Sequence, residues 1–149
     1  MEDQFDMSMN KDDGDELFSV FVKKVRNLNK SIRWVGIANQ SGILIKETYR
    51  EGLKPLLSSE ENLEYAANTI ARHKERIKYE AKIGKLEYSL VKYEKVNRMM
   101  IPINDNNYYY YFLLFTLDVE EIDYDKIVRE KIIPFAKRER HIFFDSKTQ

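Results

Sequence analysis

One stretch decides the fold: residues 32–49, which read IRWVGIANQSGILIKETY. In its first half, Ile32 to Ala38, side chains alternate between two faces that are both partly apolar, which is typical of a central strand. Asn39-Gln40-Ser41-Gly42 is a hairpin signal, because Gly42 can adopt a positive φ at the exit of the turn. Residues 43–49 then form the partner strand. The stretch therefore predicts a β-hairpin whose first strand lies inside a sheet.

A helix is expected before this hairpin. It should begin near Asp15, where acidic residues crowd the first turn and complement the helix dipole. Its apolar positions recur at helical spacing, and Phe18 and Val22 widen them into a broad arc. Such an arc is wide for a helix that covers only one neighbour, which favours a position between the core and a second surface.

A second helix is expected after the hairpin. Ser58 can cap its first turn, and Glu61, three residues later, can close a capping box. Apolar residues follow on one side from Leu63 to Ala81, and basic residues line the other side. Gly84 is a suitable C-terminal cap after a basic last turn. We therefore expect a long helix over residues 58–82.

Three further strands and a last helix follow. Leu86–Tyr93 alternates cleanly and suits an edge strand, Arg98–Ile103 is a short apolar run, and Tyr108–Leu117 is apolar on both faces, as a central strand should be. The last helix should start near Asp123. Pro134 lacks a backbone donor, so we expect a kink or a break there.

The element order α-β-β-α-β-β-β-α predicts an α+β fold, in which helices cover both sides of a central five-stranded antiparallel sheet in three α/β/α layers. We expect one domain over residues 15–145. The first sixteen residues hold seven acids and one base, and we interpret residues 1–14 as an acidic disordered tail.

This layout resembles the Roadblock/dynein light chain family and its longin and profilin-like relatives, over residues 16–140. The resemblance rests on Ile32–Ala38 before the Gly42 turn, the long helix Ser58–Lys82, and the hairpin strands Met99–Ile103 and Tyr109–Leu117. It implies that the first and fifth strands lie centrally and that the third is an edge, as the hydrophobic periods also indicate. It further implies dimerisation through the third strand and second helix, and a role as a scaffold or small-GTPase regulator.

The leading hypothesis is therefore a non-catalytic protein–protein interaction domain that forms a homodimer, with further protein partners left unnamed. An exposed strand edge and the broad arc of the first helix are its candidate surfaces. The candidate interface residues are Leu86, Tyr88, Leu90, Phe18 and Val22.

Catalytic and cofactor motifs are absent. The chain has no cysteine, two histidines and five scattered glycines, so it offers no thiol chemistry, no zinc-finger spacing and no glycine-rich phosphate loop. His73 lies between Arg72 and Lys74, and we expect it to be solvated. We therefore expect no catalytic residue, no metal and no cofactor, and not an enzyme.

A basic stretch keeps nucleic-acid binding open as a less favoured alternative. Residues 72–98 hold nine bases and four acids, interleaved with tyrosines, a combination found in nucleic-acid grooves. A solvated helix face or a surface for an acidic partner, including the chain's own tail, explains the same pattern. The candidate patch is Arg72, Lys74, Arg76, Lys78, Lys82 and Lys85.

A small-molecule sensor is the other alternative, with Trp34, Tyr108 and Tyr110 lining a pocket. The zero formal net charge argues against binding nucleic acid by bulk charge. The argument is weaker for the folded domain alone, because the first sixteen residues contribute a net charge of −6 and the rest of the chain +6. No run approaches the ~20 apolar residues that span a bilayer, and the acidic start is unlike a signal peptide, so we expect a cytoplasmic protein without membrane contact.

Overall fold

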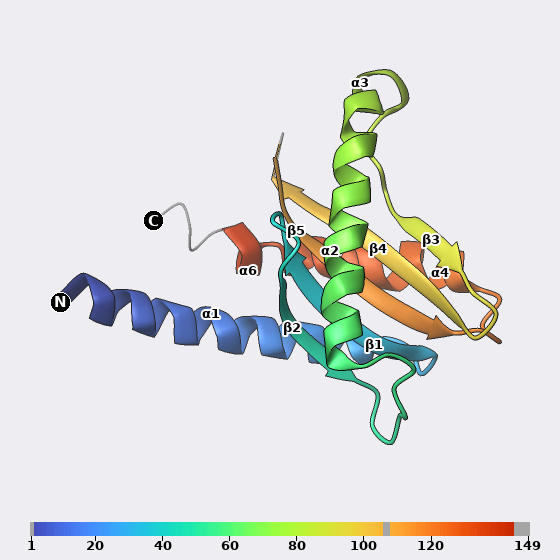
Figure 1. The fold of residues 1–149 in the computed structure, drawn as a ribbon, viewed down its shortest axis with the longest axis horizontal. Helices are drawn as coiled ribbons and strands as arrows, with labels where there is room; N and C mark the ends of the chain where they lie inside the picture. The colour runs from blue at the N-terminus through green and yellow to red at the C-terminus, as the bar shows by residue number, and fades with distance from the viewer. Residues whose placement is uncertain (1, 106–107, 145–149) are drawn as a thin grey trace.

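The structure is a computed structural model that describes residues 2–105 and 108–144, with side chains described from residue 14 onward except those of residues 108 and 110. Five strands pair antiparallel in the order β2-β1-β5-β4-β3 (Figure 1). Their bounds are β1 Ile32–Asn39, β2 Leu44–Tyr49, β3 Ser89–Lys92, β4 Val96–Asp105 and β5 Tyr108–Asp118. The α+β fold with a five-stranded antiparallel sheet is confirmed, with β1 and β5 inside the sheet and β3 at an edge.

Helices cover both faces of this sheet (Figure 1). They are α1 Glu2–Arg26, α2 Ser59–Arg76, the 3-10 turn η1 Ile77–Tyr79, α3 Glu80–Ile83, α4 Tyr124–Ile127, the π-helical turn η2 Val128–Ile132, α5 Ile133–Arg138 and α6 His141–Phe144. The helix α2 crosses one face, and α1 with the C-terminal helices covers the other. The three layers follow from strands that are apolar on both faces.

The two faces carry separate cores. On the α1 side, Phe21 and Val25 pack with strand residues such as Ile37 and Phe115. On the α2 side, Ala66 and Ile70 of the helix pack on Trp34, Ala38, Met100, Phe112 and Leu114 of the strands. Successive strand residues point to opposite faces, so one strand supplies both cores.

The hairpin between β1 and β2 forms at the expected residues. The Asn39 carboxamide oxygen accepts hydrogen bonds from the backbone N–H groups of Ser41 and Ile43, at 2.9 and 3.0 Å. Gly42 has a φ of 84°, a conformation that L side chains rarely adopt. The turn therefore depends on the side chain of Asn39 and on the glycine at position 42, both of which can be recognised in the sequence.

The capping box at the start of α2 also forms. The backbone N–H of Glu61 donates to the Ser58 hydroxyl at 3.1 Å, and the backbone N–H of Ser58 donates to the Glu61 carboxylate at 2.9 Å. The helix ends at Arg76, and η1 and α3 continue the chain as far as the positive-φ Gly84. The expected helix over residues 58–82 is thus three consecutive pieces.

The bounds of α1 and β3 differ from those expected. The helix α1 begins at Glu2 rather than near Asp15, and its N-terminal part projects away from the sheet (Figure 1). The disorder of segment 1–14 stays a prediction, and the side chains of residues 1–13 lie outside the described residues. The edge strand β3 is only Ser89–Lys92, because pairing with β4 ends at Met100 and leaves residues 86–88 outside the strand.

The C-terminal helix is irregular close to the expected position. Residues Val128–Ile132 form a π-helical turn, in which the backbone N–H of Ile133 donates to the carbonyl of Val128. Pro134 follows in the first turn of α5, where the missing donor is tolerated. The widened turn thus accommodates the proline, as π-turns do within longer helices.

Candidate functional site

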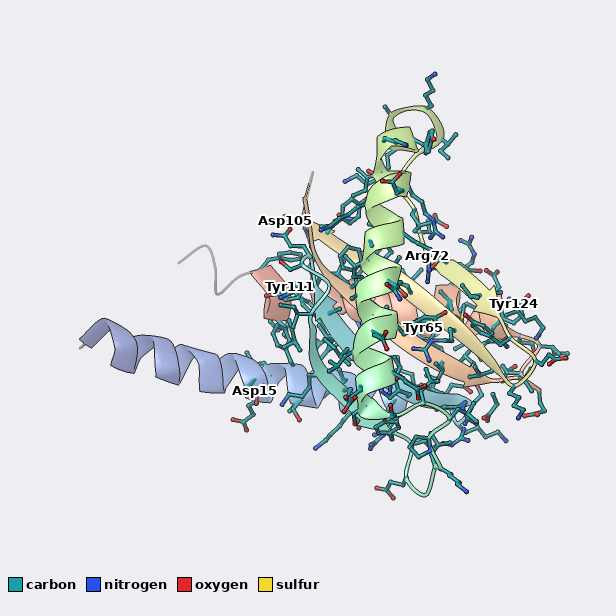
Figure 2. The ribbon with its side chains drawn as sticks, in the orientation of Figure 1. Asp15, Tyr65, Arg72, Asp105, Tyr111 and Tyr124 are labelled. Atoms are coloured by element: carbon teal, nitrogen blue, oxygen red, sulfur yellow. The ribbon has the colours of Figure 1, made fainter. Side chains whose placement is uncertain are left out.

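The first candidate site is the surface formed by β3 and the adjoining side of α2, which we call the α2/β3 surface. A shallow groove between the two elements is lined by Tyr65, Thr69, Arg72, Arg76, Ser89 and Val91. Tyr65 and Arg72 project from α2 on the side that faces β4 and β3 (Figure 2). Val91 and Tyr93 are exposed large apolar side chains next to this groove. The surface therefore combines an open strand edge, apolar side chains and basic residues.

The backbone of β3 explains why its outer edge is open. The Tyr93 N–H donates to the Val96 carbonyl at 2.9 Å, and the pairs Val91–Arg98 and Ser89–Met100 continue the ladder. In an antiparallel ladder the intervening residues, Leu90 and Lys92, direct their backbone groups away from β4. In the described part of the chain, no strand pairs with that edge.

The predicted basic patch is exposed. Its members lie on α2, η1, α3 and the segment that follows: Arg72, Lys74, Arg76, Lys78, Lys82 and Lys85. They do not share one face, because Arg72 and Arg76 line the α2/β3 groove whereas Lys74 lies beside the β1–β2 turn. Arg98, which belongs to the same basic stretch, is buried and contributes nothing to an exposed face.

The candidate interface residues divide into two groups. Leu86, Tyr88 and Leu90 are half-buried beside the edge, where they pack against the protein's own cores. Val22 is fully buried, so the expectation that it lies on an interaction surface is corrected.

Phe18, the other candidate interface residue on α1, is partly buried against aromatic side chains of the same chain. Its ring lies 5.4 Å from that of Tyr111 and 5.5 Å from that of Phe143. The C-terminal segment thus covers the arc of α1 that the sequence left without a neighbour.

His73 is the clearest correction among single residues. It was expected to be solvated, but it is 0% exposed and packs against Tyr109 and Phe112 with ring centres 4.8 and 5.1 Å away. Neither ring nitrogen has a hydrogen-bond partner among the described residues. Burial lowers the pKa of His73, which the nearby Glu80 carboxylate opposes. The spacing Ala66, Ile70, His73 was the signal that could have placed it inside.

The second candidate site is a pocket of about 490 Å³ on the same side of the sheet as α2. Trp34, Tyr49, Tyr65 and Tyr93 line it, together with Arg98 and with Leu53, Pro55, Leu56 and Leu57. Trp34 was a predicted pocket residue and lies in this wall. The side chains of Tyr108 and Tyr110, the other two predicted pocket residues, lie outside the described residues.

Two groups in this pocket are electrostatically unusual. Burial, aided by the hydrogen bond to the Tyr93 hydroxyl, raises the pKa of Tyr65 to about 12. Burial lowers the pKa of Arg98, while the neighbouring tyrosines act in the opposite direction. Tyr65 and Arg98 were not singled out as pocket residues from the sequence. Arg98 alternates with Met100 on β4, and that spacing alone would have placed its side chain on the buried α2 side.

No protein-family model and no curated protein matches the sequence. Solved structures do match the fold. An MglB described as having a tetrameric arrangement superposes with a TM-score of 0.65 at 10% identity, covering 90% of each chain. MglB from Myxococcus xanthus gives 0.60 at 13% identity, covering 88% of this chain and 94% of that one.

A Roadblock/LC7 domain from Streptomyces avermitilis gives a TM-score of 0.55 at 9% identity, covering 74% of this chain and 83% of that one. The chain therefore has a Roadblock/longin-like fold, which confirms the resemblance found from its element order. Within residues 2–105 and 108–144, no helix is long and apolar enough to cross a membrane.

Proposed function

We propose that the chain is a non-catalytic interaction domain that forms a homodimer through the α2/β3 surface and regulates a small GTPase, as the Roadblock resemblance implies. The observation that carries the proposal is the open edge of β3 beside an exposed stripe of α2. A second copy can add its own β3 to that edge and extend the sheet from one subunit into the other.

A two-fold axis makes such an interface self-complementary. Two copies of β3 related by this axis run antiparallel, and so do two copies of α2. The first half of α2 carries Glu60, Glu61 and Glu64, and its second half carries Arg72 and Arg76. Antiparallel pairing therefore sets acidic residues of one helix beside basic residues of the other. This charge pattern supports self-association and gives it a register.

Two residues test this register. Tyr65, Arg72 and Arg76 line the groove beside β3, and Glu61 precedes Tyr65 by one helical turn. Replacing Arg72→Glu brings like charges together across the two-fold axis, so we expect the dimer dissociation constant to rise about tenfold. Adding Glu61→Gln, which preserves an N3 side chain able to close the capping box, should recover part of that loss. Sedimentation equilibrium measures all three proteins.

The matched control is Lys74→Glu, which makes the same charge change on the same helix but beside the β1–β2 turn. It should leave the dissociation constant unchanged. A wild-type chain that sediments as a strict monomer at micromolar concentrations, or equal effects of Arg72→Glu and Lys74→Glu, would contradict the proposed dimer.

The regulatory part of the proposal has its own test. The immobilised chain should retain a small GTPase from a lysate of its source cells, and retention should differ between GDP and a non-hydrolysable GTP analogue. Identification of the retained protein by mass spectrometry, with the Arg72→Glu variant in parallel, tells whether GTPase binding needs the dimer. Retention that is the same with either nucleotide counts against regulation.

A further inference from the structure

The aromatic pocket beside α2 has a size and a lining that fit a small organic molecule. Its volume of about 490 Å³ lies within the range of known ligand sites, about 300–1,000 Å³. The aromatic part of its wall consists of Trp34, Tyr49, Tyr65 and Tyr93, and Leu53 adds an aliphatic side chain. Rings in such walls stack on flat or apolar ligands.

Arg98 gives this apolar pocket a charge. Its side chain is largely buried, and the guanidinium carbon lies 3.8 Å from the centre of the Tyr65 ring and 5.4 Å from that of Trp34. No ion pair joins Arg98 to a carboxylate of the residues that the structure describes. An arginine stays charged in proteins, and a buried charge is usually paired. The guanidinium therefore lacks the negative partner that such a position normally requires.

The other charged groups around the pocket are already paired or lie at its mouth. Arg33 forms an ion pair with Asp118 at 3.1 Å. The Glu47 carboxylate does not line the pocket, and it accepts a hydrogen bond from the indole N–H of Trp34 at 2.8 Å. Glu94 and Lys95 are exposed neighbours of opposite sign. What remains in the pocket is one buried positive charge.

We propose that this pocket binds a small aromatic carboxylate, whose carboxylate accepts hydrogen bonds from Arg98 while its ring stacks among Trp34, Tyr65 and Tyr93. A guanidinium matches a carboxylate in charge and in planar geometry. A phosphate monoester, at −1.5 to −2, carries more charge than one guanidinium compensates. The ligand is thus a monoanion with a flat apolar body, and its site adjoins the α2/β3 surface, with which it shares Tyr65.

Trp34 supplies the readout, because it is the one tryptophan of the chain and lies in the pocket wall. A titration series from benzoate to 4-phenylbutyrate, each acid beside its primary amide, is followed by tryptophan fluorescence and confirmed by calorimetry. We expect at least one acid to bind saturably and its amide to bind about tenfold more weakly. Phenyl phosphate should bind more weakly than the best acid. If no acid binds at millimolar concentration, or acids and amides bind equally, the proposal is wrong.

Two variants test whether Arg98 supplies the charge that makes the acid bind more tightly than its amide. Arg98→Met should reduce the preference for the acid over the amide to about onefold, while its circular dichroism stays that of the wild type. Arg129→Met removes an arginine that does not line this pocket and should keep the preference. A preference that survives in a folded Arg98→Met protein overturns the assignment. If Arg98→Met does not fold, the comparison of each acid with its amide in the wild-type protein still tests whether the pocket prefers a carboxylate.

Discussion

His73 shows how one residue ties the stability of this protein to pH. The ring projects from α2 and is fully buried against β5, where Tyr109 and Phe112 each pack against it in a T-shaped arrangement. Arg76 disfavours the protonated ring and Glu80 favours it, but burial has the largest effect and keeps the pKa below its ordinary value. The Glu80 carboxylate is itself engaged by the hydroxyl of Tyr109. A proton on His73 therefore enters an environment that does not solvate it.

The consequence is a loss of stability in mild acid. Because the pKa of His73 is lower in the folded than in the unfolded chain, the unfolded chain binds more protons once pH falls through about 6.5. We expect the free energy of unfolding to decrease between pH 7.5 and 5.5, and to decrease less in His73→Leu. Urea denaturation across this range measures it. His141→Leu removes the other histidine, which is exposed, and should keep the wild-type slope; identical slopes for all three proteins would contradict the account.

At the scale of elements, the local sequence defines the start of α2 more clearly than any other part of this helix. The reciprocal hydrogen bonds of Ser58 and Glu61 satisfy two backbone N–H groups that the helix itself cannot. This turn fixes where α2 begins, and therefore which residues of the helix face the core and which face β3.

Removal of the cap should be measurable. Ser58→Ala leaves the Glu61 N–H without its acceptor and should lower the free energy of unfolding by about 1 kcal/mol. Ser58→Asp, whose carboxylate can also cap the helix, should retain most of the wild-type free energy of unfolding. Ser59→Ala changes the neighbouring serine, which makes no capping bond, and should fall within about 0.5 kcal/mol of wild type in the same denaturation experiment. Equal losses from Ser58→Ala and Ser59→Ala would show that the cap contributes nothing.

Elements that depend on interactions between residues close in sequence were predictable from the sequence. The Asn39–Gly42 turn, the Ser58 cap and the periods of β1 and β5 each depend on neighbours along the chain. The length of β3 was not predictable, because alternation continues through Leu86 and Tyr88 although pairing with β4 ends earlier. Its end is decided by contacts between elements, which a single period does not record.

The candidate sites were less predictable for a related reason. His73 and Arg98 have polar side chains, and polarity suggested solvent where spacing suggested the interior. Arg98 is accommodated only because Trp34 and Tyr65, distant in sequence, supply aromatic faces for its guanidinium. A pocket assembled from segments so far apart cannot be recognised before the sheet order is known.

At the scale of the whole molecule, an aromatic cluster joins the two ends of the chain. Phe143 of α6 is fully buried, and its ring contacts those of Phe18 and Phe21 on α1. It also contacts Tyr111 of β5, which lies beside α6 (Figure 2). The C-terminal segment therefore belongs to the core that α1 shares with the sheet, rather than to a tail.

Removing the ring of Phe143 should lower the stability of the fold. Phe143→Ala leaves a cavity among the aromatic rings that surround it, so we expect the free energy of unfolding to fall by about 3–5 kcal/mol. Ile122→Ala shortens an exposed side chain and should change it by less than about 0.5 kcal/mol. Thermal and urea denaturation compare the two. A Phe143→Ala protein as stable as Ile122→Ala would place the C-terminal segment outside the core.

The sheet order has a consequence for the time course of folding. β1 pairs with β5, so Val35 meets Phe115 across most of the chain, and the cluster around Phe143 needs residues later still. A chain emerging from the ribosome can close the β1–β2 hairpin early, but its apolar faces wait until β5 has been synthesised. Contacts this distant in sequence make folding slow, and the exposed interval invites aggregation. Because β5 lies between β1 and β4, the sheet of the nascent chain cannot close until β5 has been synthesised.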